Sequence, residues 1–349
     1  MAAEDTVSDA ELGPRVEADA ATADGPGSPP QARSVSFLIV GTPRSGTTLL
    51  QRLACEIRGV AMPPETQFFL RHVPKLLRRR EFPLDAAALR EELEIYARTR
   101  PAPGMTPDID RIVDELGGTC SSSIELFDAI ARNLADGGDV LGEKTPNHLL
   151  WWRPLTRAMP KLKVIVTVRE ARAVVASTID MPWNKWNSHL VLAERWALEQ
   201  GEVRRALKAL GPGRMILLRY EDVVVDPARA RSTIASFLGI LDEPGQPQVR
   251  EGAPGSIVMP WEWWKDGVLG PIRRDHVANW HAKLTPEEAA DVAAICRKEL
   301  RRFGYDVDGW GPWHRARMML RHSPREHLKR IRFRIQRRRH MARISRIQL

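Results

Sequence analysis

Apolar residues cluster in short, nearly continuous runs between residues 36 and 240. The clearest runs lie at 37–40, 164–168 and 215–218, with a shorter one at 139–142. Runs of this kind are typical of strands that are buried on both faces of a parallel sheet. Between them, apolar residues recur three and four positions apart, as on one face of a helix. The alternation predicts an α/β fold, a three-layer domain with a central parallel sheet.

Helix signals fill the intervals and extend beyond the last run. The strongest start is Thr285, which is followed by Pro286 and two glutamates, because Thr is a favoured N-cap and Pro is favoured at the first helical position. Gly304 is expected to end this helix. Further helices are predicted over residues 85–97, 121–135 and 188–210.

The loop after the first strand carries the most specific motif, GTPRSGTT at residues 41–48. Gly41 and Gly46 have the spacing of a P-loop, in which backbone N–H groups and a helix N-terminus bind phosphate. Thr47 replaces the usual lysine, and Arg44 lies inside the loop. The motif therefore indicates a P-loop-like fold and a site for a phosphate-like group other than a triphosphate. An ordinary glycine-rich turn is the alternative.

Charge is distributed unevenly along the 349 residues, whose net charge is +9. Residues 1–33 hold seven acids and two arginines among many Ala, Gly and Pro, and are expected to form a disordered acidic lead. From residue 314 onward there are 13 Lys and Arg and a single acid. The predicted organisation is thus the lead at 1–33, a nearly neutral α/β domain at 34–313 and a basic tail at 314–349.

The basic tail alternates Arg with apolar residues such as Leu328, Ile331 and Ile335, which predicts a basic amphipathic helix. Such a helix binds an anionic membrane surface or is simply exposed to water. No apolar run approaches the roughly 20 residues that cross a bilayer. Nothing else in the chain suggests nucleic-acid recognition, so no nucleic-acid partner is expected.

Three cysteines, Cys55, Cys120 and Cys296, lie far apart and lack the spacing of a metal site. Their odd number, and an N-terminus without the basic and apolar regions of a signal peptide, predict reduced thiols and a cytoplasmic protein. Peripheral attachment at the inner membrane face would come from the tail. Cys55 and Cys296 occur in apolar helical patterns and are expected in the core.

Two further strand ends carry cations. Lys144 follows the run at 139–142, and Arg169 follows the strand that ends at residue 168, with Ser177 eight residues later. Ligands gather beyond the carboxyl ends of parallel strands. A P-loop NTPase usually has an Asp there for Mg²⁺, whereas Arg with Ser predicts a seat for a second phosphate. A P-loop small-molecule kinase or NTPase remains the alternative function.

Together these motifs resemble the sulfotransferases that use 3′-phosphoadenosine 5′-phosphosulfate (PAPS). The resemblance extends over residues 36–300 and includes PRSGTT in the loop, Lys-Thr-Pro at 144–146, the pair Arg169 and Ser177, and Tyr-Glu-Asp at 220–222. It implies in-line transfer of a sulfuryl group from PAPS to an acceptor hydroxyl. The residues expected to bind PAPS are Arg44, Ser45, Gly46, Thr47, Thr48, Arg169, Ser177 and Tyr220.

Resemblance to tyrosylprotein-type sulfotransferases implies the catalytic groups. Glu65 lies 21 residues after Arg44, where that type has its catalytic base, although an acid at this place could simply favour a helix dipole. His148 is a second base candidate, but a lone helical His is more often structural. Lys144 and Arg44 are expected to stabilise charge on the leaving oxygen, so no metal is required. The implied partner is an acceptor that carries a hydroxyl group, and a lipid, a glycan, a small metabolite and a peptide all remain open.

No motif specifies the acceptor. Tryptophans near the expected site either line an acceptor pocket, since indole rings stack on sugars and cover lipid-like surface, or hold a loop to the body of the protein. In the sulfotransferases that the chain resembles, a segment at this position closes over the nucleotide. The resemblance therefore makes Arg273, Arg274 and Asn279 candidates for contacting phosphate. The tryptophans concerned are Trp183, Trp186, Trp261, Trp263, Trp264 and Trp280.

Overall fold

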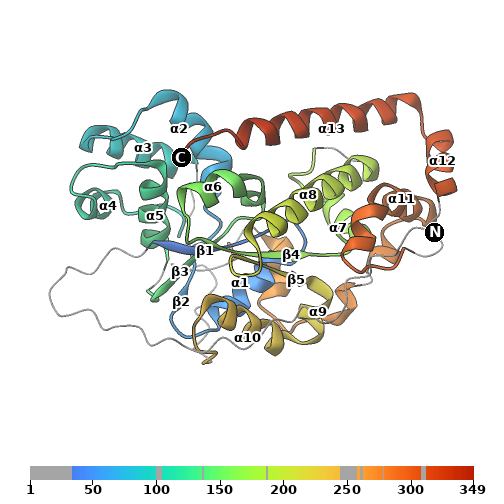
Figure 1. Ribbon diagram of the computed structural model, residues 1–349, viewed down its shortest axis with the longest axis horizontal. Coiled ribbons are helices and arrows are strands. Elements are labelled where there is room, and N and C mark those ends of the chain that lie inside the picture. Colours follow the sequence, from blue (N-terminus) through green and yellow to red (C-terminus); the bar gives the residue numbers. More distant parts are fainter. Residues whose placement is uncertain are drawn as a thin grey trace. The chain divides into compact units, whose positions relative to one another are not determined.

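A five-stranded parallel sheet forms the centre of the protein (Figure 1). The computed structural model describes residues 34–99, 104–135, 137–185, 188–243, 258–259, 262–277, 279–307 and 312–349, so the predicted lead lies outside the described residues. The strands are β1 (Val35–Gly41), β2 (Val60–Ala61), β3 (Val140–Lys144), β4 (Lys163–Val168) and β5 (Met215–Arg219). Their order is β2-β3-β1-β4-β5, and every pairing is parallel, which confirms the predicted α/β class.

β1 lies in the middle of the sheet. Its Ile39 is opposite Lys144 of β3 on one side and opposite Ile165 of β4 on the other. The chain completes β2 and β3 on one side of β1 before it crosses to β4 and β5. The carboxyl end of β1 is therefore a switch point of the topology, which is where open α/β sheets bind their ligands.

Alternate residues of β1 face two different helical layers. Phe37 and Ile39 pack against α1 (Thr47–Cys55), α9 (Tyr220–Val225) and α10 (Pro227–Leu238), which lie below the sheet in Figure 1. Leu38 and Val40 face the opposite layer. That layer contains α5 (Ser123–Leu134), α6 (Trp152–Ala158), α7 (Ala171–Thr178), α8 (His189–Leu210) and α11 (Pro286–Arg302).

The predicted helices correspond to α3, α5, α8 and α11. Thr285 begins α11 with a capping box, in which its side chain and that of Glu288 exchange hydrogen bonds with each other's backbone N–H, and Gly304 follows its end with φ 71°. The remaining elements are η2 (Phe68–His72), α2 (Val73–Arg79), α3 (Ala86–Thr99), α4 (Ile109–Glu115), η3 (Pro146–Trp151), η4 (Trp263–Val268), η5 (Arg274–Val277), η6 (Asn279–Ala282), α12 (Pro312–Arg321) and α13 (Pro324–Ile344).

The basic C-terminal segment folds into α12 and α13, as its amphipathic pattern predicts. α13 packs along α8, where Arg334 forms a two-pronged ion pair with Glu194 at 2.5 and 2.6 Å, and Arg337 pairs with Glu199. Both carboxylates are almost fully buried. Among the described helices, none is long and apolar enough to cross a membrane.

All three cysteines are buried. This confirms the core positions expected for Cys55 and Cys296. Burial raises the pKa of the Cys55 thiol to about 12 and that of Cys120 to about 11, so both stay protonated near neutral pH and are weak nucleophiles.

Candidate active site

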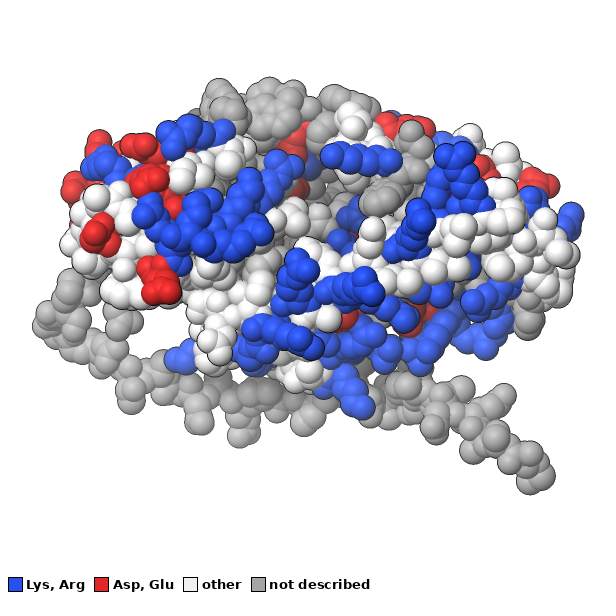
Figure 2. Space-filling view, turned by 90° about the horizontal axis from the view of Figure 1, so that it is seen from above, with Lys and Arg blue, Asp and Glu red and all other residues white. Residues whose placement is uncertain are grey.

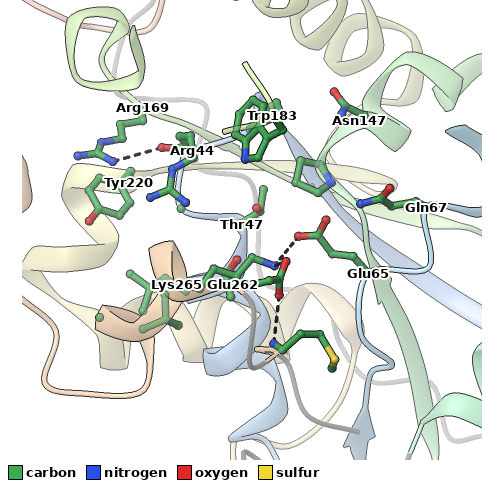
Figure 3. A pocket seen from close by; sticks show the side chains of 18 of the residues that line it. Arg44, Thr47, Glu65, Gln67, Asn147, Arg169, Trp183, Tyr220, Glu262 and Lys265 are labelled. Atoms are coloured by element: carbon green, nitrogen blue, oxygen red, sulfur yellow. Dashed lines mark hydrogen bonds and ion pairs between the residues drawn. The ribbon is translucent and has the colours of Figure 1, made fainter. Parts of the chain in front are cut away.

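A cavity of about 870 Å³ opens at the carboxyl edge of the sheet (Figure 3). Its walls come from the loop after β1, the turn before η2, the end of β4, the start of α9 and η4. Residues far apart in the sequence therefore meet where the topology places a ligand site.

The loop after β1 presents the N-terminus of α1 to this cavity. Gly46 is the N-cap of α1, has φ 95° and provides no side-chain cap, so the first N–H groups of the helix stay available to an anion. A Cβ atom added to Gly46 would lie 2.3 Å from the ring of Tyr220. Glycine is therefore required here for two reasons, the positive φ and the close approach of the Tyr220 ring. Thr47 and Thr48 line the cavity beside it.

Ser45 turns its side chain away from the cavity. Its hydroxyl donates to the carbonyl oxygen of Thr42 at 2.6 Å and to that of Thr167 at 3.3 Å, and it is fully buried. The hydroxyl of Thr167 in turn donates to the carbonyl oxygen of Ser45 at 2.9 Å. Its backbone N–H also donates to the carbonyl oxygen of Thr42, at 3.1 Å. Ser45 therefore ties the loop to β4, and both of its donors are used within the protein, contrary to its expected contact with PAPS.

Arg44, Arg169 and Ser177 lie together, as their motifs predict for two neighbouring anion seats. Nη1 of Arg169 donates to the carbonyl oxygen of Arg44 at 3.2 Å, and Nε of Arg44 donates to Oγ of Ser177 at 3.1 Å. The Arg169 guanidinium also stacks 4.3 Å from the ring centre of Tyr220. Burial, together with the positive charge of Arg169, lowers the pKa of Arg44 to about 10.

Arg44 has the left-handed backbone angle φ 75°, and Gln67, across the cavity, has φ 49°. They are the two non-glycine residues with positive φ among the described residues. Such conformations cost of order 1–3 kcal/mol each and concentrate at functional sites.

Four charged groups form a cluster at the cavity: Glu65, Lys265 and Glu262 line it, whereas Lys144 is fully buried and does not line it. Oε1 of Glu65 lies 2.5 Å from Nζ of Lys144 and 2.9 Å from Nζ of Lys265. Lys265 also pairs with Glu262 at 2.6 Å. Burial opposes ionisation of Glu65, but the two ammonium groups outweigh it and hold the pKa of Glu65 well below its usual range. Burial lowers the pKa of Lys144.

Sequence reasoning missed Lys265, which lies in a segment without periodicity or motif. η4 carries it over α1, where Nη1 of Arg52 donates to the carbonyl oxygens of Val268 at 2.6 Å and Gly270 at 2.7 Å. The fixed position of η4 places Lys265 against Glu65, 200 residues away in the sequence.

Glu143 is a second residue that sequence reasoning missed. This fully buried carboxylate at the end of β3 accepts hydrogen bonds from the backbone N–H and the hydroxyl of Thr66, at 3.1 and 2.9 Å, and from the hydroxyl of Thr145 at 2.6 Å. Nδ1 of His148 lies 2.9 Å from its other oxygen. Glu143 thereby joins the turn that holds Glu65 to the segment that follows Lys144.

His148 is fully buried and packs edge-on against Phe69. It is not among the residues that line the cavity, whereas Glu65, the other base candidate, is. The arrangement gives His148 a clear structural contact, its hydrogen bond to Glu143.

The tryptophans divide between the two interpretations. Trp183 lines the cavity, opposite Gln67, and is 37% exposed. Trp280 instead stacks on His281, and the guanidinium of Arg172 lies over its ring, 4.4 Å from the ring centre. Trp186 and Trp261 lie outside the described residues, and of Trp263 and Trp264 only the backbone, in η4, is described.

Of the three polar candidates near η4, Arg273 lines the cavity. Arg274 donates to the carbonyl oxygen of Val225 at 3.1 Å, and Asn279 begins η6 without contributing to the cavity wall.

Comparison with known proteins identifies the family. The model of the sulfotransferase family matches residues 36–244, more than half of the chain. The chain belongs to the sulfotransferase family. The match covers the loop after β1, Glu65, Lys144, Arg169 and Tyr220. It favours sulfuryl transfer over the alternative of a P-loop kinase.

Relatives of this sulfotransferase cover most of its length. Protein-tyrosine sulfotransferase 2 of Gallus gallus is 25% identical over 287 residues, which are 77% of this chain and 69% of that protein. The sulfotransferase domain from the curacin biosynthetic pathway is 20% identical, with a TM-score of 0.52 over 78% of this chain and 99% of that chain. The sulfotransferase domain of a Synechococcus olefin synthase is 19% identical, with a TM-score of 0.50 over 78% of this chain and 95% of that chain. The two structures confirm the fold.

Proposed function

We propose that this sulfotransferase takes its sulfuryl group from PAPS and transfers it in line to an acceptor hydroxyl. Arg44 and the backbone N–H groups of Gly46, Thr47 and Thr48 would bind the 5′-phosphosulfate, and Ser45 would hold the loop against β4. The 3′-phosphate would lie between Arg169 and Ser177, with Tyr220 beside the nucleotide. The proposal depends most on the hydrogen bond between Arg169 and Arg44, because it brings the two predicted anion seats into contact.

The charge of the site fits a doubly anionic nucleotide. Two guanidinium groups lie in one partly buried cavity, and burial together with the charge of Arg169 lowers the pKa of Arg44. An anion between them would relieve this repulsion, and the N-terminus of α1 adds a positive dipole end. PAPS supplies the activated sulfuryl group, and the remaining chemistry falls to side chains of this protein.

Glu65 is the proposed base. Its lowered pKa keeps the carboxylate ionised at neutral pH, and it lines the cavity. It would accept the proton of the acceptor hydroxyl as that oxygen bonds to sulfur. Contact between Lys144 and the leaving oxygen would withdraw a positive charge from Glu65 and raise its basicity at that moment. His148 is the second candidate, but its burial and its bond to Glu143 favour Glu65.

Lys144 and Arg44 would stabilise the negative charge that develops on the bridging oxygen when the bond to sulfur breaks. Preoriented charge of this kind is commonly the largest catalytic contribution, worth about 2.7–4 kcal/mol per donor. We propose that these cations take the place of Mg²⁺ in transfer and that no metal ion takes part in the reaction.

The acceptor would enter beside Glu65 on the side away from Arg169. Figure 3 shows Gln67, Asn147 and Trp183 around this part of the cavity, and Leu70 and Met105 add apolar surface. A mixed polar and apolar wall suits a hydroxylated lipid, glycan or small metabolite.

We further propose that α13 brings the enzyme to an anionic membrane surface. Its outer face exposes Leu328, Ile331 and Ile335, which follow helical spacing, while its inner face pairs with α8. Figure 2 shows Lys and Arg crowded on the face seen from above, the side on which α13 lies in Figure 1. Each basic residue near an anionic bilayer contributes about 1 kcal/mol.

Labelled PAPS tests the proposed reaction directly. Incubation of the protein with ³⁵S-PAPS and an extract of lipids and metabolites should label a discrete acceptor, and EDTA should leave the rate unchanged. Calorimetry should show tight binding of adenosine 3′,5′-bisphosphate and weak binding of ATP. Preference for ATP would contradict the proposed donor, and bisphosphate binding without turnover on any acceptor would indicate a nucleotide-binding scaffold.

A further inference from the structure

Two histidines and an aspartate meet at the junction of α8, α11 and α12. His189 is the first residue of α8, Asp291 lies on α11, and His322 follows the last residue of α12. Nε2 of His189 lies 3.2 Å from Oδ2 of Asp291, and Nε2 of His322 lies 2.6 Å from the same oxygen. One ligand atom from each residue lies within 4.8 Å of the others. None of the three lines the catalytic cavity.

The spacing of these atoms is close to that of a tetrahedral metal site. Zinc binds imidazole nitrogen and carboxylate oxygen at about 2.0–2.2 Å, which places neighbouring ligands roughly 3.3 Å apart. The 3.2 Å separation already matches this edge, and the 2.6 Å separation requires a small movement of His322 away from Asp291. Two imidazoles with one carboxylate suit zinc better than Mg²⁺ or Ca²⁺, which prefer oxygen ligands.

Outer partners of the cluster also fit a metal. Oε1 of Glu288 lies 3.5 Å from Nδ1 of His189, and the guanidinium of Arg321 binds Oδ1 of Asp291. Metal-binding histidines commonly turn their second nitrogen to a carboxylate, and ligating carboxylates are themselves hydrogen-bonded.

The protonation state of His189 decides what can lie between its ring and Asp291. With the proton on Nε2, the ring donates directly to Asp291, and no ion is needed. If Nδ1 of neutral His189 carries its proton toward Glu288, Nε2 presents a lone pair to a carboxylate oxygen 3.2 Å away. Two lone pairs facing each other repel, so this arrangement needs a cation between them or a second proton on the ring. A metal ion satisfies His189, His322 and Asp291 at once.

We propose that His189, Asp291 and His322 bind one Zn²⁺, with water as the fourth ligand. The ion would join the start of α8 to α11 and to the segment that leads into α13. It would stabilise the C-terminal helices and take no part in sulfuryl transfer. His189 and His322 are partly exposed, with 12% and 19% of their side chains accessible, so the ion can enter from solvent.

Zinc titration of the 349-residue protein tests this site. After treatment with a chelator and its removal, the protein should bind one Zn²⁺ per chain, and its melting temperature should rise with zinc concentration, because a ligand that binds only the folded state stabilises it. Co²⁺ in place of zinc should give the visible absorption bands of a tetrahedral ion.

Variants identify the ligands. His322→Gln and His189→Gln should each bind zinc at least tenfold more weakly and should each lose the cobalt absorption bands. His340→Gln, on the exposed side of α13, is the control and should bind zinc as tightly as the original protein. Circular dichroism in zinc-free buffer establishes that each variant is folded. Absence of stoichiometric zinc binding, or equal binding by all four proteins, would overturn the proposal and leave a hydrogen-bonded His-Asp-His cluster.

Discussion

The guanidinium of Arg169 binds the backbone carbonyl of Arg44 at 3.2 Å, although 125 residues separate the two in the sequence. The contact joins the end of β4 to the loop after β1. It brings the predicted site for a 3′-phosphate next to the predicted site for a 5′-phosphosulfate. The variants that affect nucleotide binding are expected to act through this contact between the two sites.

Removal of the Arg169 guanidinium should weaken nucleotide binding more than it slows transfer. Arg169→Ala should reduce the affinity for adenosine 3′,5′-bisphosphate by 10- to 100-fold, since hydrogen bonds to charged groups contribute about 1.5–3 kcal/mol. Calorimetry measures the change. Arg78→Ala, on an exposed part of α2, removes the same charge elsewhere and should bind normally. Unchanged affinity in Arg169→Ala would remove the second phosphate from the proposal.

Lys144→Ala and Glu65→Gln should show the opposite behaviour. Each should lower turnover by about 10²–10³-fold or more while bisphosphate affinity changes little, because the two groups are proposed to act on the reacting atoms. Initial rates with ³⁵S-PAPS and calorimetry on the same samples separate the two effects. Lys208→Ala, an exposed residue at the end of α8, is the matched control. Full turnover in Glu65→Gln would require another base, first His148.

Gly46→Ala should abolish tight nucleotide binding. Its Cβ would lie 2.3 Å from the Tyr220 ring, so the loop or the ring must move. Gly211→Ala is a useful comparison, because Gly211 also has positive φ, 69°, but open space around the added atom. If both variants lost stability by about 1 kcal/mol and only Gly46→Ala lost binding, the steric effect would be separated from backbone strain. Normal bisphosphate affinity in Gly46→Ala would contradict the proposed seat.

Acid should destabilise the protein through His72. Burial lowers the pKa of His72 to about 4, from 6.5, and the side chain is 2% exposed. Below pH 6.5 the unfolded chain binds a proton that the folded protein does not bind until about pH 4, so stability falls as pH falls through this window.

His72 should account for about 2.5 kcal/mol of the decrease in the free energy of unfolding between pH 7.5 and pH 4.5, since one pKa unit corresponds to about 1.4 kcal/mol. Urea unfolding at the two pH values should show a shallower pH dependence for His72→Gln than for the original protein. The exposed His281→Gln serves as control. Equal slopes for all three proteins would show that His72 titrates normally.

Membrane attachment should depend on the outer face of α13. The triple variant Leu328→Ser, Ile331→Ser, Ile335→Ser should bind vesicles of phosphatidylserine and phosphatidylcholine at least tenfold more weakly, because each buried aliphatic side chain contributes about 1.5–3 kcal/mol. Flotation assays measure the binding. Leu241→Ser, which changes another strongly exposed leucine, should have no effect. Vesicle binding that is the same with and without phosphatidylserine would refute the electrostatic part of the proposal.

Sequence alone predicted the parallel sheet and the strand ends that carry the site, because apolar runs and glycine spacing are local signals. It also predicted that the motifs containing Arg44, Arg169 and Ser177 would meet, since parallel strands end at one edge. The family match confirms the reaction class.

Two parts of the site could not be read from the sequence. Lys265 reaches Glu65 through an irregular segment whose position depends on hydrogen bonds to Arg52, and no local pattern encodes such a contact. Glu143 belongs to none of the sequence motifs, because its importance comes from burial among Thr66, Thr145 and His148.

The pairing of α13 with α8 has a practical consequence for shortened versions of the chain. Removal of everything after residue 313 would leave Glu194 without Arg334 and Glu199 without Arg337, on a helix that also donates from Gln200 to the hydroxyl of Thr42 at 3.0 Å. Glu199 would keep its ion pair with Arg195 at 2.9 Å, whereas Glu194 would lose both Arg330 and Arg334. Truncation would therefore disturb ion pairs on the helix that contacts the loop after β1, so a loss of activity in the shortened protein would by itself say nothing about membranes.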